Sequence, residues 1–191
     1  MTTATHTDVS DEAGVIIDPD IELVKKAQQE LPYRDTAYSA LMKRHEQVLY
    51  RVCYRLLGNA DDAQDVSQEV MLKVFAYLPK FEGRSMFKTW MMQIARNTSF
   101  TMQAKLKRQR ELKEVLEGDV HQEASDRIVT EKMDVDSVLS KLGKQDREVL
   151  VMRYIAELQF DEIADVCGLS LSAAKMRVYR ATEALKKKMS T

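Results

Sequence analysis

The sequence predicts an all-α fold of two small helical domains joined by an acidic linker, and three observations support this class. Turn-forming residues are scarce, because the 191 residues include only 6 glycines and 3 prolines, about half the usual share. Apolar residues recur at helical spacing through most of the chain. The length allows one domain or two small ones, at roughly 100–200 residues per domain. With 45% hydrophobic and 31% charged residues, the chain can bury a core, which excludes global disorder.

Four helices are expected in the first half of the chain. Asp18 and Pro19 are placed to cap and open the first helix. Apolar spacing predicts a second helix over residues 36–57 and a third from about Asp61. A fourth helix, with Ser85 as its cap, is expected to run into a basic stretch. The signals that end or separate these helices are Pro32, Gly58, Pro79 and the loop 81–85.

Shorter helices are expected in the second half of the chain. They follow a stretch around Gly118 that is poor in apolar and rich in acidic residues, which we interpret as a linker. Gly143 is placed to end a helix, and Gly168 to form a tight turn between two others. The expected helices cover residues 135–142, 146–158, 160–166 and 171–188.

Charge is unevenly distributed along the chain, although the formal net charge is only -1. Residues 1–22 carry six acids and no lysine or arginine, whereas residues 80–113 carry nine bases and two acids. The sign reverses over residues 114–136, with eight acids and two bases, and again over residues 171–191, with six bases and one acid. Two separate basic patches suit a protein that contacts phosphate at two places, the alternative being solvated helix faces.

Several classes of protein lack support in the sequence. Cys53 and Cys167 match no zinc or redox spacing and are expected to be small buried residues. No nucleophile, phosphate-binding loop or cluster of metal ligands is visible, so we predict no catalytic residue, no metal site, no cofactor and no enzyme activity. No leader peptide or membrane-spanning run is found, which predicts a cytoplasmic protein without membrane insertion.

Residues 160–175 have the spacing of a helix-turn-helix. Ala164 is small where the two helices cross, and Gly168 suits the turn. The positions expected to meet inside are Ile163, Leu169, Ala174 and Val178. On the outward face of the last helix we expect Ser172, Lys175, Met176, Tyr179 and Arg180. This face mixes cations with groups able to touch base edges, which favours a major-groove helix over a plain hairpin with a basic exterior.

The third expected helix, from Asp61 to Tyr77, has two distinct faces. The residues expected inside are Ala63, Val66, Val70, Val74 and Tyr77. The residues expected outside are Asp61, Asp65, Gln68, Glu69 and Leu72. An acidic face is typical of a protein-docking surface when a leucine lies at its centre, because a solvated face has little reason to carry one. Metal binding is a weaker alternative, since a di-iron bundle would need Glu-x-x-His pairs and the chain has none.

Aromatic and polar residues alternate beyond this helix. The aromatic ones are Phe81, Phe87, Trp90 and Phe100, and the polar ones are Arg84, Lys88, Arg96, Asn97 and Lys105. Such a mixture suits a surface that stacks and cradles unpaired bases. Trp90 is given a supporting role, because tryptophan more often belongs to the core. The buried stripe of the fourth helix is expected to contain Phe87, Trp90, Met91 and Ile94.

Over about residues 20–190, the sequence resembles a sigma factor of the extracytoplasmic-function (ECF) group within the sigma-70 family. The resemblance is carried by residues 50–59 (YRVCYRLLGN), 61–73 (DDAQDVSQEVMLK) and 81–97 (FEGRSMFKTWMMQIARN), together with the helix-turn-helix. It implies that the first stretch belongs to a promoter-binding helical domain. The second would dock on the clamp helices of RNA polymerase, and the third would read and open the minus-ten element. The helix-turn-helix would read the minus-thirty-five element.

The resemblance also implies site residues. The polymerase-binding set is Asp61, Asp65, Gln68, Glu69 and Leu72. A pocket for an extruded minus-ten base corresponds to Phe81, Ile94 and Asn97, and the full minus-ten set adds Gly83, Arg84, Ser85, Phe87, Lys88 and Lys105. The minus-thirty-five set is Ser172, Lys175, Met176, Arg177, Tyr179 and Arg180. The implied partners are core RNA polymerase and promoter DNA, as duplex and as melted non-template strand, with an anti-sigma factor as a further candidate.

The domain organisation implied by the resemblance has four parts. These are an acidic, disordered tail over 1–17, a sigma region 2 domain over 18–113, a linker over 114–134 and a sigma region 4 domain over 135–191. In the reading helix the chain has Ala173-Ala-Lys-Met-Arg177 where the family commonly has Thr-Val-Lys-Ser-Arg, so we expect its minus-thirty-five preference to differ. The alternatives are a helix-turn-helix regulator that binds duplex DNA without polymerase, and a helical di-metal enzyme.

Overall fold

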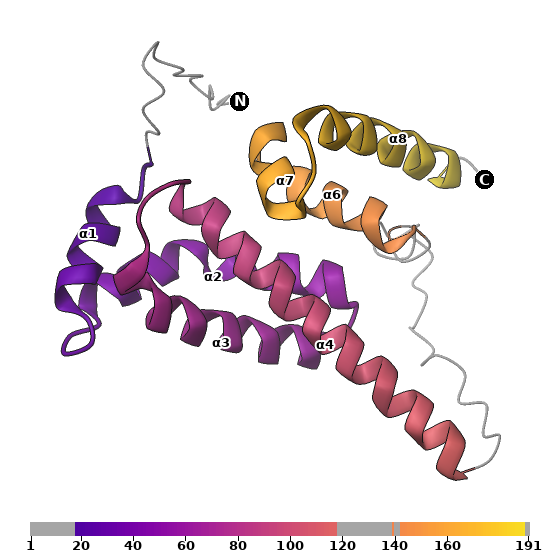
Figure 1. The fold of residues 1–191 in the computed structure, drawn as a ribbon, viewed down its shortest axis with the longest axis horizontal. Coiled ribbons are helices and arrows are strands. Elements are labelled where there is room, and N and C mark those ends of the chain that lie inside the picture. The colour runs from indigo at the N-terminus through magenta and orange to yellow at the C-terminus, as the bar shows by residue number, and fades with distance from the viewer. Residues whose placement is uncertain (1–17, 118–138, 140–141, 190–191) are drawn as a thin grey trace, which may run out of the picture.

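The computed structural model describes residues 18–117, Leu139 and residues 142–189, and every regular element in these ranges is helical (Figure 1). The all-α class is therefore confirmed for the described part of the chain. The predicted acidic tail, the predicted helix over 135–142 except Leu139 and Leu142, and the predicted linker beyond Glu117 lie outside the described residues.

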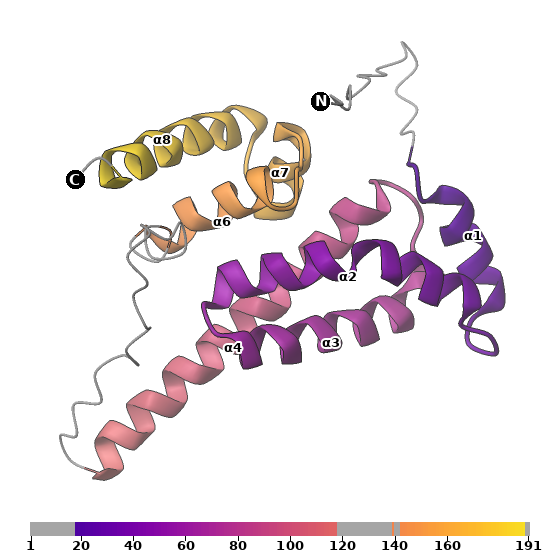
Figure 2. The same cartoon turned by 180° about the vertical axis from the view of Figure 1, so that it is seen from behind.

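The helices form two groups. The first group contains α1 (Ile21–Glu30), α2 (Thr36–Leu57), α3 (Ala60–Tyr77), the short 3-10 helix η1 (Leu78–Lys80) and α4 (Phe87–Glu117). The second contains α6 (Lys144–Tyr154), α7 (Phe160–Cys167) and α8 (Leu171–Met189). Figure 2 shows the second group beside the N-terminal half of α4, while the C-terminal half of α4 projects beyond the bundle.

The core of the first domain lies between α2, α3 and α4. Its fully buried side chains include Leu41, Leu49, Val52, Val66, Val70, Val74, Phe87, Met91 and Ala95. Each large apolar side chain buried in this way contributes about 1.5–3 kcal/mol relative to an exposed one, so the apolar stripe of each helix determines its orientation. Tyr77 was expected inside, but it is 55% exposed because the buried Leu78 of η1 fills the core at that level.

Local signals end the first helices largely as the sequence predicts. Gly58 adopts a left-handed conformation with φ 78° and closes α2 by donating its N–H to the Tyr54 carbonyl. Asn59 then caps α3, its side-chain oxygen accepting a hydrogen bond of 3.0 Å from the Asp62 N–H. The first helix begins later than predicted, at Ile21, with Asp20 at its N-cap position.

Asp18 caps α4, so the prediction that Ser85 does this is wrong. The Oδ2 atom of Asp18 accepts a hydrogen bond of 2.6 Å from the Phe87 N–H, at the first residue of α4. Its Oδ1 atom accepts another, of 2.9 Å, from the Asp20 N–H. The Ser85 hydroxyl lies instead 3.5 Å from the Met86 carbonyl. The buried carboxylate thus joins the start of the described chain to the start of α4.

A second buried acid holds α1 against α2. The Asp20 carboxylate lies 2.6 Å from Nε2 of His45 and 3.1 Å from Nη1 of Arg44, both on α2. His45 in turn packs its ring against Phe87, with 5.4 Å between centroids. Asp18 and Asp20 together therefore connect α1, α2 and α4 at one end of the bundle.

Among the described residues, the second domain consists of α6, α7 and α8 packed together. Its buried side chains include Val149, Leu150, Met152, Leu158, Ile163, Ala174, Val178 and Ala181. Helix α6 ends at Tyr154 rather than at the predicted residue 158. The loop from α6 to α7 buries the side chains of Ala156 and Leu158. Gly168 then turns the chain with φ 66°, as a helix-turn-helix requires.

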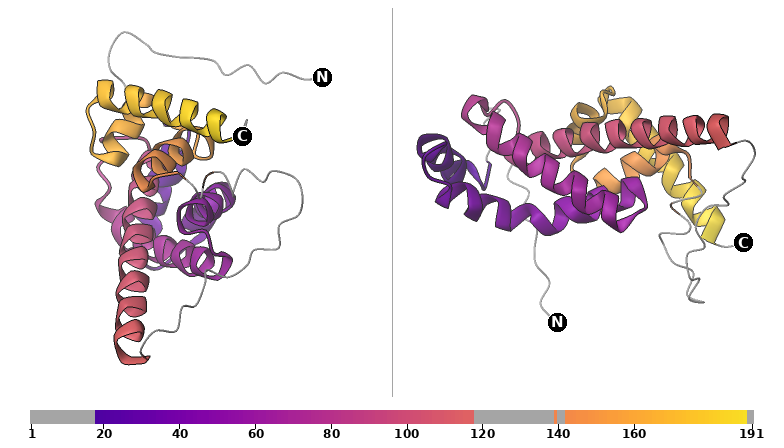
Figure 3. Two further views of the ribbon diagram at one scale, coloured as in Figure 1. Left: turned by 90° about the vertical axis from the view of Figure 1, so that its right-hand side faces the viewer. Right: turned by 90° about the horizontal axis from the view of Figure 1, so that it is seen from below.

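The two domains contact each other through α4. Helix α4 packs against α7, and α2 packs against α6. Figure 3 shows α6 and α7 along the N-terminal part of α4 in two further views. The contacts across this boundary include a hydrogen bond from Thr89 to Glu162 and an ion pair between Arg96 and Glu148.

Replacing Asp18 with alanine is expected to lower the free energy of unfolding by about 1–2 kcal/mol, because a helix cap and a buried hydrogen bond each contribute about 1 kcal/mol. Urea unfolding followed by circular dichroism measures this loss. Asp35→Ala is the matched control, since Asp35 occupies the N-cap position of α2 but its side chain makes no cap hydrogen bond. Equal losses in the two variants would contradict the capping role of Asp18.

Candidate polymerase- and promoter-binding surfaces

The acidic face of α3 is displayed to solvent as the sequence predicts. Its five residues, Asp61, Asp65, Gln68, Glu69 and Leu72, are all exposed. Leu72 is 70% exposed although the opposite side of the same helix is fully buried. The Glu69 carboxylate pairs with Lys73 at 2.7 Å, and Lys73 also donates a hydrogen bond of 3.0 Å to Thr98 of α4. These contacts hold the C-terminal part of the face against α4.

Tyr38 gives α3 a further anchor. Its hydroxyl donates a hydrogen bond of 2.6 Å to the Met71 carbonyl, one residue before Leu72. Burial raises the pKa of Tyr38 to about 12, so the hydroxyl stays protonated and keeps donating at neutral pH. The backbone that carries the exposed leucine is therefore fixed to α2.

The loop before α4 is held at its first residue and at its end. The Gln28 amide donates hydrogen bonds to the carbonyls of Leu78, at 3.0 Å, and Phe81, at 2.7 Å, which fixes where the loop leaves η1. Asp18 fixes where it enters α4. Between these points Gly83 has φ 70°, a conformation that favours glycine. The exposed Arg84 pairs with Glu82 at 2.5 Å, while Ser85 is half-buried.

The residues assigned to a minus-ten base pocket fall along one face of α4. Phe81 is half-buried and lies against Trp90, with ring centroids 4.8 Å apart. Ile94 and Asn97 follow Trp90 one and two turns along the same face. Ile94 is half-buried and Asn97 is exposed, so an amide stands beside an aromatic and aliphatic wall. Lys88 is half-buried and Lys105 is exposed further along α4.

Phe87 lies in the buried stripe of α4, as its helical spacing predicts, so its place in the minus-ten set implied by the resemblance needs correction. Its side chain is completely buried, with ring centroids 5.4 Å from His45 and 6.3 Å from Phe81. It therefore supports Phe81 from beneath. Trp90 is half-buried against the same pair, in keeping with the supporting role expected of it.

Arg96 is a functional candidate that the sequence analysis left in a general list. Its Nη1 atom donates a hydrogen bond of 3.2 Å to Oδ1 of Asn97, and its guanidinium lies 4.7 Å from the centroid of Phe100. Its Nε atom donates to the Glu148 carboxylate of the second domain. The sequence signal that could have singled out Arg96 is a cation directly beside Asn97, the amide predicted to read a base.

The helix-turn-helix is built as predicted. The Gln159 and Glu162 side chains form a capping box at the start of α7. The Ser170 hydroxyl accepts a hydrogen bond of 3.2 Å from the Ala173 N–H at the start of α8. Ala174, Val178 and Ala181 are buried, which leaves the opposite side of α8 free to face outward.

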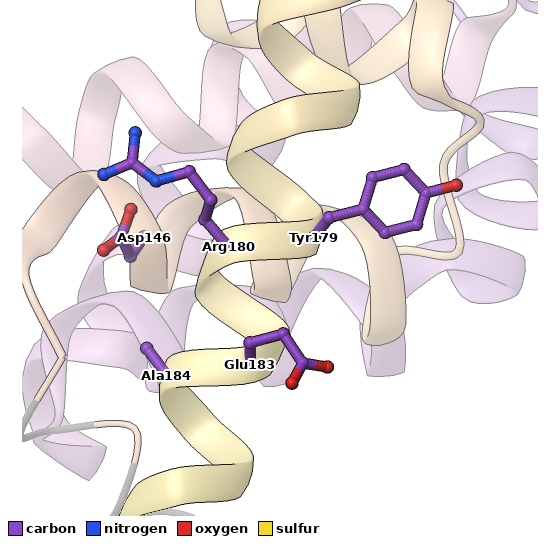
Figure 4. Close-up of a pocket in the computed structure, with 5 residues that line it drawn as sticks. All are labelled: Asp146, Tyr179, Arg180, Glu183 and Ala184. Carbon is purple, nitrogen blue, oxygen red and sulfur yellow. The ribbon is translucent and has the colours of Figure 1, made fainter.

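The outward residues of α8 divide into two groups. Ser172, Lys175, Met176 and Tyr179 are exposed, and Tyr179 lies 5.9 Å from Phe160 of α7 between ring centroids. Figure 4 shows Arg180 pointing to the other side of α8, beside Asp146 of α6. Both residues line an open pocket of about 440 Å³ with Tyr179, Glu183 and Ala184. Arg180 therefore lies at the flank of the surface, beside the Asp146 carboxylate.

Arg177 departs further from the prediction. It is half-buried, and its charge acts on the Cys167 thiol at the end of α7. At about 100° per residue it lies next to the inward Ala174 and Val178, not at the centre of the outward face. It therefore stands at the edge of the outward face of α8.

Two further observations concern sites of other kinds. Among the residues described, no group of three or more His, Cys, Asp or Glu side chains is placed to hold a metal ion. In the same residues, no helix is both long and apolar enough to cross a membrane.

Comparison with known proteins shows that the helices carrying these surfaces belong to two described families. Residues 41–109 match the family described as Sigma-70 region 2, and residues 132–185 match Sigma-70, region 4; together they cover more than half of the chain. The first range contains α3 and most of α4, and the second contains the helix-turn-helix. The chain belongs to the ECF sigma factors of the sigma-70 family. Sigma factors direct RNA polymerase to promoters and are not enzymes, so the predicted function and the predicted lack of enzyme activity are confirmed.

Two curated relatives are matched over most of their length. This sigma factor is 29% identical over 182 residues to the ECF RNA polymerase sigma factor SigW of Bacillus subtilis, covering 88% of this chain and 94% of SigW. It is 28% identical over 156 residues to the ECF RNA polymerase sigma factor SigC of Mycobacterium tuberculosis, covering 78% and 81% of the two chains.

Two solved structures share the fold. CnrH in complex with the cytosolic domain of CnrY superposes with a TM-score of 0.68 at 24% identity, covering 91% of this sigma factor and 98% of that chain. RpoE from Bartonella quintana, in complex with the anti-sigma factor NepR, gives a TM-score of 0.65 at 24% identity, covering 81% and 97% of the two chains.

Cys53 is buried as expected, whereas Cys167 is only half-buried. Both thiols are predicted to react slowly with a thiol reagent in the folded protein. Burial raises the pKa of the Cys53 thiol above its ordinary value of 9.0, and burial followed by the Glu148 carboxylate raises that of Cys167. The folded state then holds these protons more tightly than the unfolded state, so their contribution to stability is complete below pH 9 and falls as the pH rises further.

Reaction with Ellman's reagent at pH 8, in buffer and in urea, measures the predicted protection. The Cys53→Ala, Cys167→Ala and double variants assign each phase to a thiol. Two thiols that react in buffer as fast as in urea would contradict the burial.

Proposed function

We propose that α3 docks this sigma factor on core RNA polymerase, that α4 and the loop before it read and open the minus-ten element, and that α8 reads the minus-thirty-five element. The observation that carries the proposal is the exposed side of α3, where a leucine 70% open to solvent stands among four polar residues. In the proposed organisation, residues 1–17 form a tail, 18–113 sigma region 2, 114–134 a linker and 135–191 sigma region 4.

The α3 face has the properties of a docking surface. Covering Leu72 with a partner contributes a favourable free energy of about 25 cal/mol for each Å² of apolar surface buried. The carboxylates around it favour a basic partner surface, so the complex is expected to weaken as salt screens the charges. A helix-turn-helix regulator that binds duplex DNA without polymerase would not need this docking surface on α3.

The α4 face has the properties of a base-reading surface. Taking a base out of the stack costs a few kcal/mol, which contacts with the flipped base must offset. Asn97 can donate and accept hydrogen bonds at a base edge, while Phe81 and Ile94 offer apolar contact to the ring. The proposed minus-ten surface is Phe81, Gly83, Arg84, Ser85, Lys88, Ile94, Asn97 and Lys105, with Phe87 beneath it.

The α8 face is proposed to enter the major groove. Lys175 and Ser172 can contact phosphates or base edges, and Tyr179 adds an aromatic ring with a hydroxyl. Met176 is 60% exposed and offers apolar contact, for example to a thymine methyl, where the family commonly has a serine. Arg180 is assigned to the flank of this surface, where phosphate contact is its expected role.

The proposal extends to location and regulation. The cytoplasm holds the polymerase and the DNA that this sigma factor needs, so we place it there. An anti-sigma factor is a further proposed partner, because the structurally similar RpoE was solved bound to one.

Replacing Asp65 and Glu69 with lysine is expected to abolish co-purification with core RNA polymerase, because it turns the acidic face of α3 basic. Circular dichroism should show unchanged helix content, since both residues are exposed. The control is Glu22→Lys with Glu46→Lys, which alters the net charge equally at exposed positions of α1 and α2. Undiminished binding by the α3 variant, or equal loss in the control, would refute the docking assignment.

Asn97→Ala is expected to impair promoter opening more than closed-complex binding, because the amide is proposed to act on an unstacked base. Permanganate footprinting on a duplex promoter measures opening, and a premelted template serves as the control. A loss of activity confined to the duplex would support a role in capture of the base during melting. Opening as efficient as in the wild type would exclude Asn97 from the pocket.

A further inference from the structure

Helix α1 supports the loop before α4, although none of its residues belongs to the proposed DNA surfaces. It lies at the end of the bundle where α4 begins (Figure 1), and it packs against η1, the turn that precedes the loop. Its buried Val24 and Ala27 anchor it in the core of the first domain. Gln28, the next residue, is half-buried and directs its side chain to η1.

The Gln28 amide bridges the two ends of the η1 turn. Its nitrogen donates to the Leu78 carbonyl at 3.0 Å and to the Phe81 carbonyl at 2.7 Å, from 50 and 53 residues away in the chain. An amide nitrogen has two N–H donors, so it can satisfy both carbonyls at once. The Leu78 carbonyl also accepts a hydrogen bond of 3.0 Å from the Phe81 N–H. The backbone of Phe81 is thus held through both of its polar groups.

The ring of Phe81 is supported by two other aromatic rings. The centroid of Trp90 lies 4.8 Å from that of Phe81, and the centroid of Phe87 lies 6.3 Å from it. Phe87 is completely buried, so the Phe81 ring rests on the core. Apolar contacts of this kind are not directional, whereas hydrogen bonds to a carbonyl are. The Gln28 amide therefore supplies the directional part of the support for Phe81.

The loop between Phe81 and Phe87 is held by two anchors that come from one short segment of the chain. Gln28 holds Phe81 at the start of the loop. At its end, the Asp18 carboxylate accepts the Phe87 N–H at 2.6 Å. Gly83, with φ 70°, turns the chain between these points. The position of α1 against η1 and α4 therefore determines the span of the loop.

We propose that Gln28 is a positioning residue for minus-ten recognition, which fixes Phe81 and the start of the loop so that the pocket selects one base over the others. Gln28 acts through Phe81 and contacts no DNA itself. The inference rests on the proposed function of the loop and α4 as the minus-ten reader. It adds α1 to the elements that determine the choice of promoter.

Selection of a base depends on the placement of the pocket walls more strongly than capture of a base does. An aromatic ring can stack on any base, because every base has a π-face. Telling bases apart requires polar groups and walls that are held within about 0.5 Å of the productive geometry. Asn97 is carried by the regular helix α4, whereas Phe81 lies at the start of a loop. Loss of the Gln28 contacts is therefore expected to relax selection while stacking, and with it activity, is largely retained.

The test uses holoenzyme assembled from core RNA polymerase and the full chain. The templates are one promoter that the sigma factor recognises and its single-base variants, which place each of the four bases at every minus-ten and minus-thirty-five position. Transcription from this set gives base selection at each position, as the ratio between the preferred base and the others. Thermal unfolding and co-purification with polymerase check that folding and docking are retained.

Gln28→Leu is expected to lower base selection at one or more minus-ten positions about fivefold, the effect of one hydrogen bond to a base edge. Selection at the minus-thirty-five positions should stay unchanged. Gln28→Glu should act in the same way, because a carboxylate has the shape of the amide but cannot donate at neutral pH. The matched control is Gln29→Leu at the adjacent, exposed glutamine of α1, which should change selection at no position.

Unchanged minus-ten selection in both Gln28 variants would overturn the inference. An equal loss of transcription on every template would overturn it as well, because a general defect in folding has that effect. Phe81→Ala separates these results from a failure of the proposed function. If Phe81→Ala relaxes minus-ten selection and the Gln28 variants do not, only the role of Gln28 is wrong. If Phe81→Ala leaves minus-ten selection intact, the proposed base pocket is wrong, and the inference with it.

Discussion

Three faces of helix α4, which has 31 residues, have different roles. One packs in the core, one is proposed to contact DNA, and one contacts the second domain. Phe87, Met91 and Ala95 are buried against α2 and α3. Trp90, Ile94 and Asn97 form the face proposed for the minus-ten base, and Thr89 and Arg96 face the second domain. Because helical periodicity fixes the angles between these faces, the orientation that buries the first also sets the direction of the other two.

The position of α4 depends on buried polar contacts as much as on apolar packing. Asp18 caps its first residue, and Lys73 joins it to α3 through Thr98. Each contact involves a group that would be costly to leave buried without a partner. The reading surface is therefore placed on a rigid helix with a fixed start, which suits recognition of an unstacked base.

Electrostatics explains how an almost neutral chain serves a nucleic-acid partner. The net charge of -1 hides basic residues gathered on α4 and α8 and acids displayed on α3. Several of these cations meet carboxylates of the same chain, as Arg96 does with Glu148 and Lys107 with Glu111. Part of the basic surface is thus already paired within the protein.

The features that depend on local pattern could be predicted from the sequence. Residues 36–57 form α2 exactly within the predicted bounds, and Gly58 and Gly168 take the turns assigned to them. The errors come from contacts between distant parts of the chain. Asp18 lies 69 residues from the N–H it caps, and Glu148 lies 52 residues from Arg96, so no local pattern reveals either pair.

Burial explains the remaining differences at the site. The resemblance places Phe87 in the minus-ten set, whereas helical spacing places it in the buried stripe of α4, and its complete burial agrees with the spacing. Tyr77 shows the opposite error, since the neighbouring Leu78 takes the core position. The faces of α3 and α8 were predictable because period 3.6 separates inside from outside on a regular helix.

The central claim is that this chain gives RNA polymerase its choice of promoter. The most direct measurement is transcription of genomic DNA by core polymerase with and without the protein, followed by mapping of the start sites. The account predicts a set of start sites that appears only with the protein and shares common minus-ten and minus-thirty-five sequences. An identical set of start sites in both reactions would contradict it.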